Sequence, residues 1–138
     1  MGKRVKEVMS SEPCAIEAEK PVSYAAKMMK DENVGMAPVV EGDRLVGALT
    51  DRDIVTRVVA EGKDPGSVTA REAASTKLVT AEPEQDLDEA LKMMASKQVR
   101  RLPVVENGRL VGVLAQADVA RQANDKKTGE VVEQISKP

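Results

Sequence analysis

Thr50 and Asp53, in the segment GALTDRD from Gly47 to Asp53, have the types and spacing to hold a ribose and a phosphate. The pattern predicts Thr50 as a helix N-cap and Asp53 as the third helical residue, so both side chains would face the helix start. Unpaired backbone amides favour phosphate there, and a carboxylate can accept both hydrogens of a vicinal ribose diol. The two residues can equally serve only as a cap, worth about 1 kcal/mol. The segment alone does not decide between these roles.

A second segment, GVLAQAD from Gly112 to Asp118, resembles the first but differs at a position that matters for binding. Asp118 keeps the carboxylate, whereas Ala115 stands where Thr50 supplies a hydroxyl. We therefore expect a second site that is weaker or altered.

Both segments belong to a repeat with a constant offset of 65 residues. The same offset separates Pro38 from Pro103 and relates PVVE and RLVG of the first copy to identical runs in the second. It also pairs Met28 and Met29 with Met93 and Met94, and it needs no gap. The chain is therefore a tandem duplication.

The first four elements of each copy can be predicted from local patterns. An extended piece, CAI from Cys14 or LVT from Leu78, precedes a helical run whose methionines we assign to the core. Two β-rich runs follow, joined by Gly42-Asp43 or Asn107-Gly108, pairs that two-residue hairpin turns favour. Before the helical run of copy two, Asp86 and Glu89 are placed to form a capping box.

A second helix closes each copy, from Thr50 to about Glu61 with Gly62 as its stop, and from Gln116 to about Ala123. The fold class is therefore α+β, with the order β-α-β-β-α occurring twice. Because one copy alone has a thin core, we expect the two sheets to pack against each other about a pseudo-two-fold axis.

The repeat predicts where the domains begin and end. Repeat 1, with an N-terminal segment and a linker, is expected at 1–66, repeat 2 at 67–124, and a C-terminal tail at 125–138. Thr69 and Glu72 are placed to cap a short helix that leads into repeat 2.

Composition excludes several classes of site. The net charge of -2 lacks the basic excess of a non-specific nucleic-acid binder. With no histidine and with Cys14 as the single cysteine, neither an internal disulfide nor a zinc site of thiolates and imidazoles can form. We expect Cys14 to be a small buried hydrophobe. Without a signal peptide or an apolar membrane span, we expect a soluble, cytoplasmic protein.

The doubled pattern of a methionine-containing helix, PVV, RLVG and GALTDRD resembles a pair of cystathionine-beta-synthase (CBS) domains, also called a Bateman module. The resemblance covers Val5 to about Ala123. The runs LTDRDIV, EGKDP and QVRRLPVV are most similar to small stand-alone actinobacterial CBS-pair proteins of the hypoxic-response type.

The resemblance implies a regulatory module that binds AMP, ADP, ATP or S-adenosylmethionine in clefts between the repeats. It makes Asp53 the ligand of the ribose diol, with Thr50 beside it on ribose or phosphate, and Asp118 the equivalent of Asp53. It also implies that Arg100 and Arg101 meet phosphates, although by default such a surface pair is solvated or salt-bridged. Copy one has Gly35 and Met36 at the corresponding positions, so this basic charge is one-sided.

Adenine would need an apolar slot, and Tyr24 is the only aromatic residue of the chain. The slot must therefore be aliphatic and lined by backbone. Our candidates lie at strand edges, and in copy one they are Ala15, Ile16, Ala37 and Pro38. In copy two they are Thr80, Ala81, Leu102 and Pro103.

Three functions compete. We favour an adenosine-nucleotide sensor that acts through an unidentified regulated protein or through rearrangement of a homodimer, since CBS pairs commonly dimerise through their helices. The alternative is a non-catalytic interaction or oligomerisation module with a vestigial site, for which Ala115 argues. An enzyme is not expected, because the sequence offers no nucleophile beside a base, no phosphate-binding glycine loop and no metal cluster.

Overall fold

The computed structural model describes residues 2–122, so the predicted tail at 125–138 lies outside the described residues. Contacts divide the chain into two compact units. The first-repeat unit is Cys14–Leu78, and the second-repeat unit combines Met1–Pro13 with Val79–Pro138.

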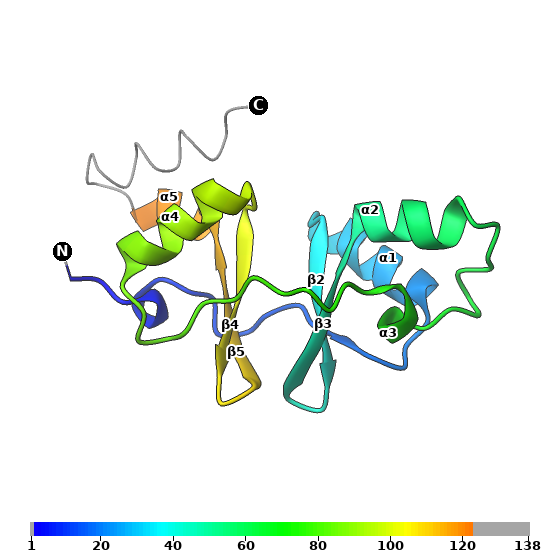
Figure 1. Cartoon of the computed structure of the whole chain (residues 1–138), viewed down its shortest axis with the longest axis horizontal. Coiled ribbons are helices and arrows are strands. Elements are labelled where there is room, and N and C mark those ends of the chain that lie inside the picture. Colours follow the sequence, from blue (N-terminus) through cyan, green and yellow to red (C-terminus); the bar gives the residue numbers. More distant parts are fainter. Residues whose placement is uncertain (1, 123–138) are drawn as a thin grey trace. The chain divides into compact units, whose positions relative to one another are not determined.

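In the first-repeat unit β1 pairs parallel to β2. The strands β2 and β3 pair antiparallel as a hairpin (Figure 1). A four-residue α-helix, α2, follows β3 directly and continues into a π-helical turn, η2. The elements are β1 (Ile16–Glu17), α1 (Val22–Glu32), β2 (Met36–Glu41), β3 (Arg44–Thr50), α2 (Asp51–Ile54), η2 (Val55–Val59) and α3 (Ala70–Ala73).

The second-repeat unit repeats this order, except that its first extended piece forms only a parallel bridge between Ala81 and Val104. Its elements are the 3-10 turn η1 (Val5–Glu7), α4 (Leu87–Lys97), β4 (Arg101–Glu106), β5 (Arg109–Ala115) and α5 (Gln116–Gln122). The mixed α and β class predicted from the sequence is confirmed in each unit.

Both hairpins turn where the sequence predicted. The last strand pairs, Glu41 with Arg44 and Glu106 with Arg109, leave two-residue loops. Gly42 has a φ of 66°, and Asn107 and Gly108 have φ values of 53° and 82°. Positive φ at these positions is what the hairpin turns require, and it explains the glycines and asparagine in the sequence.

The helices α1 and α4 bury equivalent apolar faces in the cores of their units. Met29 and Met94 are buried, and Met28 and Met93 pack against the same cores from partly buried positions. The assignment of the methionines to the core is therefore confirmed.

The segment in front of each repeat packs on the other repeat. Residues 69–75 lie in the first-repeat unit, where Thr69 forms an isolated β-bridge with Pro21 and Ser75 forms one with Ala48. In the second-repeat unit, equivalent β-bridges join Arg4 to Asp86 and Ser10 to Val113. Each of these residues is 65 positions from its equivalent in the first-repeat unit. In Figure 1 the blue N-terminal segment accordingly lies beside β4 and β5, and α3 lies beside β2 and β3. The compact units group residues by packing, and the repeat boundaries at 66 and 67 stay a prediction.

One of the two predicted helix caps is absent and the other is present. Asp86 is the N-cap of α4, but its side chain makes no capping hydrogen bond, so the predicted box with Glu89 is wrong. Separately, the N–H of Leu87 donates to the carbonyl of Lys3 at 2.9 Å, which joins the start of α4 to the N-terminal segment. The predicted cap of Thr69 and Glu72 is confirmed, and hydrogen bonds from Thr69 lower the pKa of the Glu72 carboxyl.

Ion pairs hold the segment in front of each repeat, residues 4–10 and residues 69–75, on the repeat against which it packs. Arg71 of α3 pairs with Glu19 at 3.1 Å and with Glu41 at 2.5 Å. Lys6 pairs with Glu84 at 2.6 Å, and this hydrogen-bonded carboxylate raises the pKa of Lys6. All these side chains are exposed, so the pairs specify the docking position more than they stabilise it.

The expectation for Cys14 is wrong, because this residue is exposed. The strand begins only at Ile16, the first buried side chain of this segment.

Among residues 2–122, no helix combines the length and the apolarity that crossing a membrane requires.

Candidate functional site

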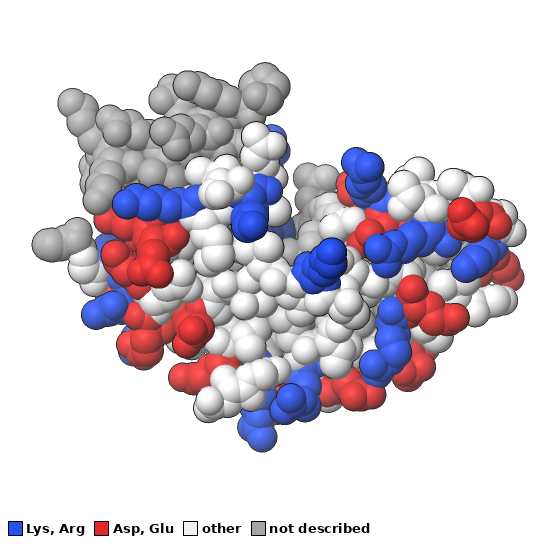
Figure 2. Space-filling view, viewed as in Figure 1, with Lys and Arg blue, Asp and Glu red and all other residues white. Residues whose placement is uncertain are grey.

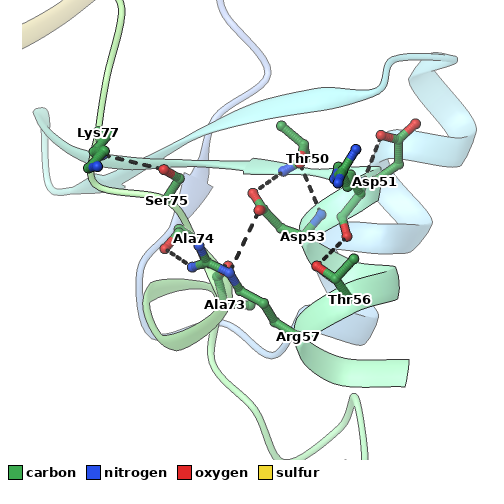
Figure 3. A network of polar contacts seen from close by, with 10 residues as sticks. Thr50, Asp51, Asp53, Thr56, Arg57, Ala73, Ala74, Ser75 and Lys77 are labelled. Carbon is green, nitrogen blue, oxygen red and sulfur yellow. Dashed lines mark hydrogen bonds and ion pairs between the residues drawn. The ribbon is translucent and has the colours of Figure 1, made fainter. Parts of the chain in front are cut away.

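Thr50 and Asp53 form a reciprocal capping box at the start of α2 (Figure 3). The N–H of Asp53 donates to Thr50 Oγ1, and the N–H of Thr50 donates to Asp53 Oδ2, both at 3.0 Å. The predicted N-cap geometry is therefore confirmed. The structure positions both side chains at the helix start, and whether they also hold a ligand stays a prediction.

The second carboxylate oxygen of Asp53 faces Arg57, one turn further along the helix. The distance from Asp53 Oδ1 to Arg57 Nε is 3.9 Å, and the side chains of Asp53 and Arg57 are 14% and 50% exposed. Arg57 Nη1 also donates to the carbonyl of Ala74 at 3.1 Å and, less closely, to that of Ala73 at 3.4 Å (Figure 3). Sequence analysis missed Arg57, although a basic residue four positions after a helical aspartate signals such a pair.

The helix that carries these residues does not remain a regular α-helix. From Val55 to Val59 it takes π geometry, with a bond of 2.8 Å from the Ala60 N–H to the Val55 carbonyl five residues back. Gly62, with a φ of 69°, then ends the run, as predicted. The wider turn buries Val58 and leaves Val55 and Val59 exposed. Such π turns are frequent at functional sites.

The residues predicted to line an adenine slot are mostly core residues. In copy one, Ile16 and Ala37 are 1% and 0% exposed. Pro38 is also buried, and only Ala15 is partly exposed. In copy two, Ala81, Leu102 and Pro103 are buried and Thr80 is partly exposed. These side chains fill the units, so their role toward adenine stays a prediction that depends on their backbone edges.

The structure brings Arg100 and Arg101 next to the helix that carries Asp118. Arg101 pairs with Ala115 at the end of β5, and the N–H of Gln116 donates to the carbonyl of Arg100 at 2.8 Å. Asp118 lies in the first turn of α5. The arginine pair and Asp118 thus share one site region of the second-repeat unit, which has the buried methyl group of Ala115 in place of a hydroxyl.

The equivalent region of the first-repeat unit has the hydroxyl but no such arginines. Met36 pairs with Thr50, and the N–H of Asp51 donates to the carbonyl of Gly35 at 3.0 Å. The two site regions therefore share one backbone arrangement and differ in the groups that they offer to a ligand.

Charged side chains of both signs alternate over the face shown in Figure 2. This mixture agrees with the net charge of -2 and differs from the broad basic field that binds nucleic acid.

Family comparison matches residues 5–60 and 70–125 to the model described as CBS domain. YhcV of Bacillus subtilis, a CBS domain-containing protein, is 40% identical over 133 residues, covering 96% of this chain and 94% of YhcV. Hypoxic response protein 1 of Mycobacterium tuberculosis is 34% identical over 134 residues, with the same two coverages of 96% and 94%.

Solved structures agree with this similarity. The crystal structure of Hypoxic Response Protein I with two coordinated zinc ions has a TM-score of 0.79 at 34% identity and covers 88% of this chain and 99% of that one. CBSX2 in complex with AMP has a TM-score of 0.76 at 21% identity, which establishes a shared fold; it covers 88% of this chain and 96% of CBSX2. Among residues 2–122, no group of three or more histidine, cysteine, aspartate or glutamate residues is placed to hold a metal ion.

Proposed function

Because this chain belongs to the CBS domain family and carries two such domains, we propose that it is a non-catalytic regulatory module that binds an adenosine-containing ligand. The observation that carries the proposal is the reciprocal cap of Thr50 and Asp53 at the carboxyl end of β3. AMP, ADP, ATP and S-adenosylmethionine all present the ribose diol that this carboxylate suits.

The cap leaves binding capacity on both side chains. Asp53 Oδ2 accepts one N–H from Thr50, whereas Oδ1 is 3.9 Å from its nearest cation and can accept from a ribose hydroxyl. Thr50 Oγ1 accepts the N–H of Asp53 and keeps its own hydrogen for a ligand oxygen. The cap also prevents the carboxylate from rotating, so less entropy is lost when a ligand binds.

We expect Asp53→Ala to weaken binding of AMP about 30-fold or more. Hydrogen bonds to a charged acceptor contribute about 1.5–3 kcal/mol, and about 2 kcal/mol corresponds to that factor. Isothermal titration calorimetry with AMP, ATP and S-adenosylmethionine measures the change. A protein purified with its ligand would be recognisable by its ultraviolet spectrum, because the chain has one tyrosine and no tryptophan.

Asp64→Ala is the matched control for this experiment. It removes a carboxylate of the same unit that accepts a backbone N–H, that of Gly66 at 3.0 Å, and that forms no hydrogen bond or ion pair with Thr50, Asp53 or Arg57. We expect unchanged affinity in Asp64→Ala and a smaller loss in Asp118→Ala than in Asp53→Ala. Unchanged affinity in Asp53→Ala would favour the alternative, an interaction module with a vestigial site.

An apolar surface on the helices of the first-repeat unit supports a homodimer as part of the proposal. Val55 and Val59 are 57% and 63% exposed, and Val55 lines a hollow of about 530 Å³ between α1 and α2. Lys30 and Asp51 contribute opposite charges to the lining of this hollow. In a two-fold interface the same surface occurs on both copies, so Lys30 of one copy can meet Asp51 of the other. Exposed apolar surface of this kind marks interaction sites.

Val59→Asp is expected to raise the dissociation constant of the homodimer by tenfold or more, because the new carboxylate would have to be buried without a partner. Sedimentation velocity across a concentration series measures it. Ala60→Asp places the same charge on the adjacent exposed position and should leave the dimer intact. If the dimer dissociation constant rises equally in both variants, or stays unchanged in Val59→Asp, the dimer contact does not involve Val59.

A further inference from the structure

Arg57 connects the carboxylate of Asp53 to the end of α3 (Figure 3). An exposed ion pair at this spacing contributes little by itself. This guanidinium is held from two sides, however, because Nε faces Asp53 and Nη1 donates to the carbonyls of Ala73 and Ala74. The last carbonyls of a helix lack partners within the helix and readily accept from a basic side chain.

The segment that Arg57 holds is the last packed part of the first-repeat unit. Ala73 and Ala74 are 1% and 7% exposed. Ser75 exchanges two hydrogen bonds with Ala48 of β3, at 2.9 and 3.0 Å. The unit ends at Leu78, where the chain continues into the second-repeat unit. Arg57 therefore lies between the candidate ligand group and the point at which the chain leaves the unit.

We propose that Arg57 acts as a latch: its side chain holds residues 73–75 against the first-repeat unit until ligand binding releases them. This inference rests on the proposed function. Asp53 Oδ2 is occupied by the N–H of Thr50, so a ribose hydroxyl would donate to Oδ1 and weaken the attraction between this oxygen and Arg57, which lies 3.9 Å away. Once this attraction is weakened, Arg57 is held less firmly against the carbonyls of Ala73 and Ala74. Binding thereby loosens residues 73–75. Because coupling between two sites is reciprocal, removing the latch should strengthen binding.

Only the first copy has an arginine at this position of the repeat. The residue 65 positions after Arg57 is Gln122, which carries no charge. The first copy thus has both the hydroxyl of Thr50 and an arginine, Arg57, that responds when a ligand binds the carboxylate of Asp53. This difference gives the two copies distinct roles, with the response to ligand assigned to copy one.

Amide hydrogen exchange of the full chain, followed by NMR with and without AMP, tests the latch. The reporter is the Ser75 N–H, which donates to the Ala48 carbonyl. We expect AMP to raise its exchange rate about two- to fivefold, the scale of a partly exposed ion pair. Arg57→Gln should show the raised rate without AMP, no further rise with AMP, and two- to fivefold tighter binding. Arg52→Gln is the control, because the exposed Arg52 side chain makes no ion pair with any residue from 2 to 122.

The outcomes separate the latch from the binding site. If AMP binds and Ser75 exchange stays constant or slows, the latch is overturned while the site stands. An Arg57→Gln protein that still responds to AMP, or that binds it more weakly, overturns the latch as well. If AMP, ATP and S-adenosylmethionine all fail to bind the unmodified chain in calorimetry, the proposed function fails and the latch fails with it.

Discussion

A fragment of residues 14–78 is expected to unfold cooperatively on heating, whereas a fragment of residues 1–66 is expected to show no cooperative transition. The two are almost equal in length and share most of copy one. Only the first contains α3 and its flanks, which place the buried Ala70, Ala73 and Ala74 in the core and pair Ser75 with Ala48. A unit of this size has little stability to lose, so removing one wall of its core should unfold it.

Circular dichroism melts of the two fragments make this comparison. Residues 67–138 should also lack a transition alone, because Val5 and Val8 of the missing segment belong to the core of the second-repeat unit. Mixing 1–66 with 67–138 should restore folded structure, since each fragment then receives the segment that it lacks. If the fragment 1–66 folded alone with the same melting temperature as 14–78, residues 69–75 would not be needed by the first-repeat unit. That result would contradict the packing of each leading segment on the other repeat.

Gly112→Ala is expected to destabilise the protein by about 2–3 kcal/mol, near the upper end for overpacking. An added Cβ would lie 2.6 Å from the Ser10 carbonyl oxygen and 2.7 Å from the sulfur of Met9. The Met9 side chain can move aside. The Ser10 carbonyl cannot, because it accepts the N–H of Val113. The substitution therefore forces the N-terminal segment away from β5, and urea denaturation measures the loss.

The equivalent glycine of copy one provides a graded control. At Gly47 an added Cβ would lie 3.1 Å from both the Ala74 Cβ and the Ser75 carbonyl oxygen. A shift of a few tenths of an ångström relieves this contact, so we expect Gly47→Ala to cost about 1 kcal/mol. Gly66→Ala, whose Cβ would meet Asp64 at an ordinary 3.5 Å, should be close to neutral. Equal losses at Gly47 and Gly112 would show that the close approach at Ser10 does not matter.

Features that depend on neighbouring residues were predictable from the sequence. The hairpin loops follow from Gly42 and from Asn107-Gly108, because few residue types tolerate positive φ. The cap follows from a threonine three residues before an aspartate, because both partners of a capping box lie within one helical turn. The comparison of the copies likewise predicted that their site regions would differ, since Ala115 cannot replace the hydroxyl of Thr50.

Features that join distant segments were not predictable in the same way. Ser10 and Ser75 share the 65-residue offset, yet that match does not say on which repeat each segment packs. The contact of Arg57 with the carbonyls of Ala73 and Ala74 depends on where α3 docks, and the π turn depends on how Val58 meets the core. The burial of most side chains predicted to line an adenine slot was not predictable either, and their role toward adenine stays a prediction.

The sequence by itself thus determined the duplication, the order of elements and the candidate pair Thr50 and Asp53, all of which depend on periodicity and local hydrogen bonding. Tertiary structure alone decided that the leading segment of each repeat completes the other, and that Arg57 lies between Asp53 and residues 73–75. The physical reason is that a docking position is chosen by the fit of whole surfaces, which includes the close approach at Gly112 and the ion pairs of Lys6 and Arg71. No single stretch of the chain contains that information.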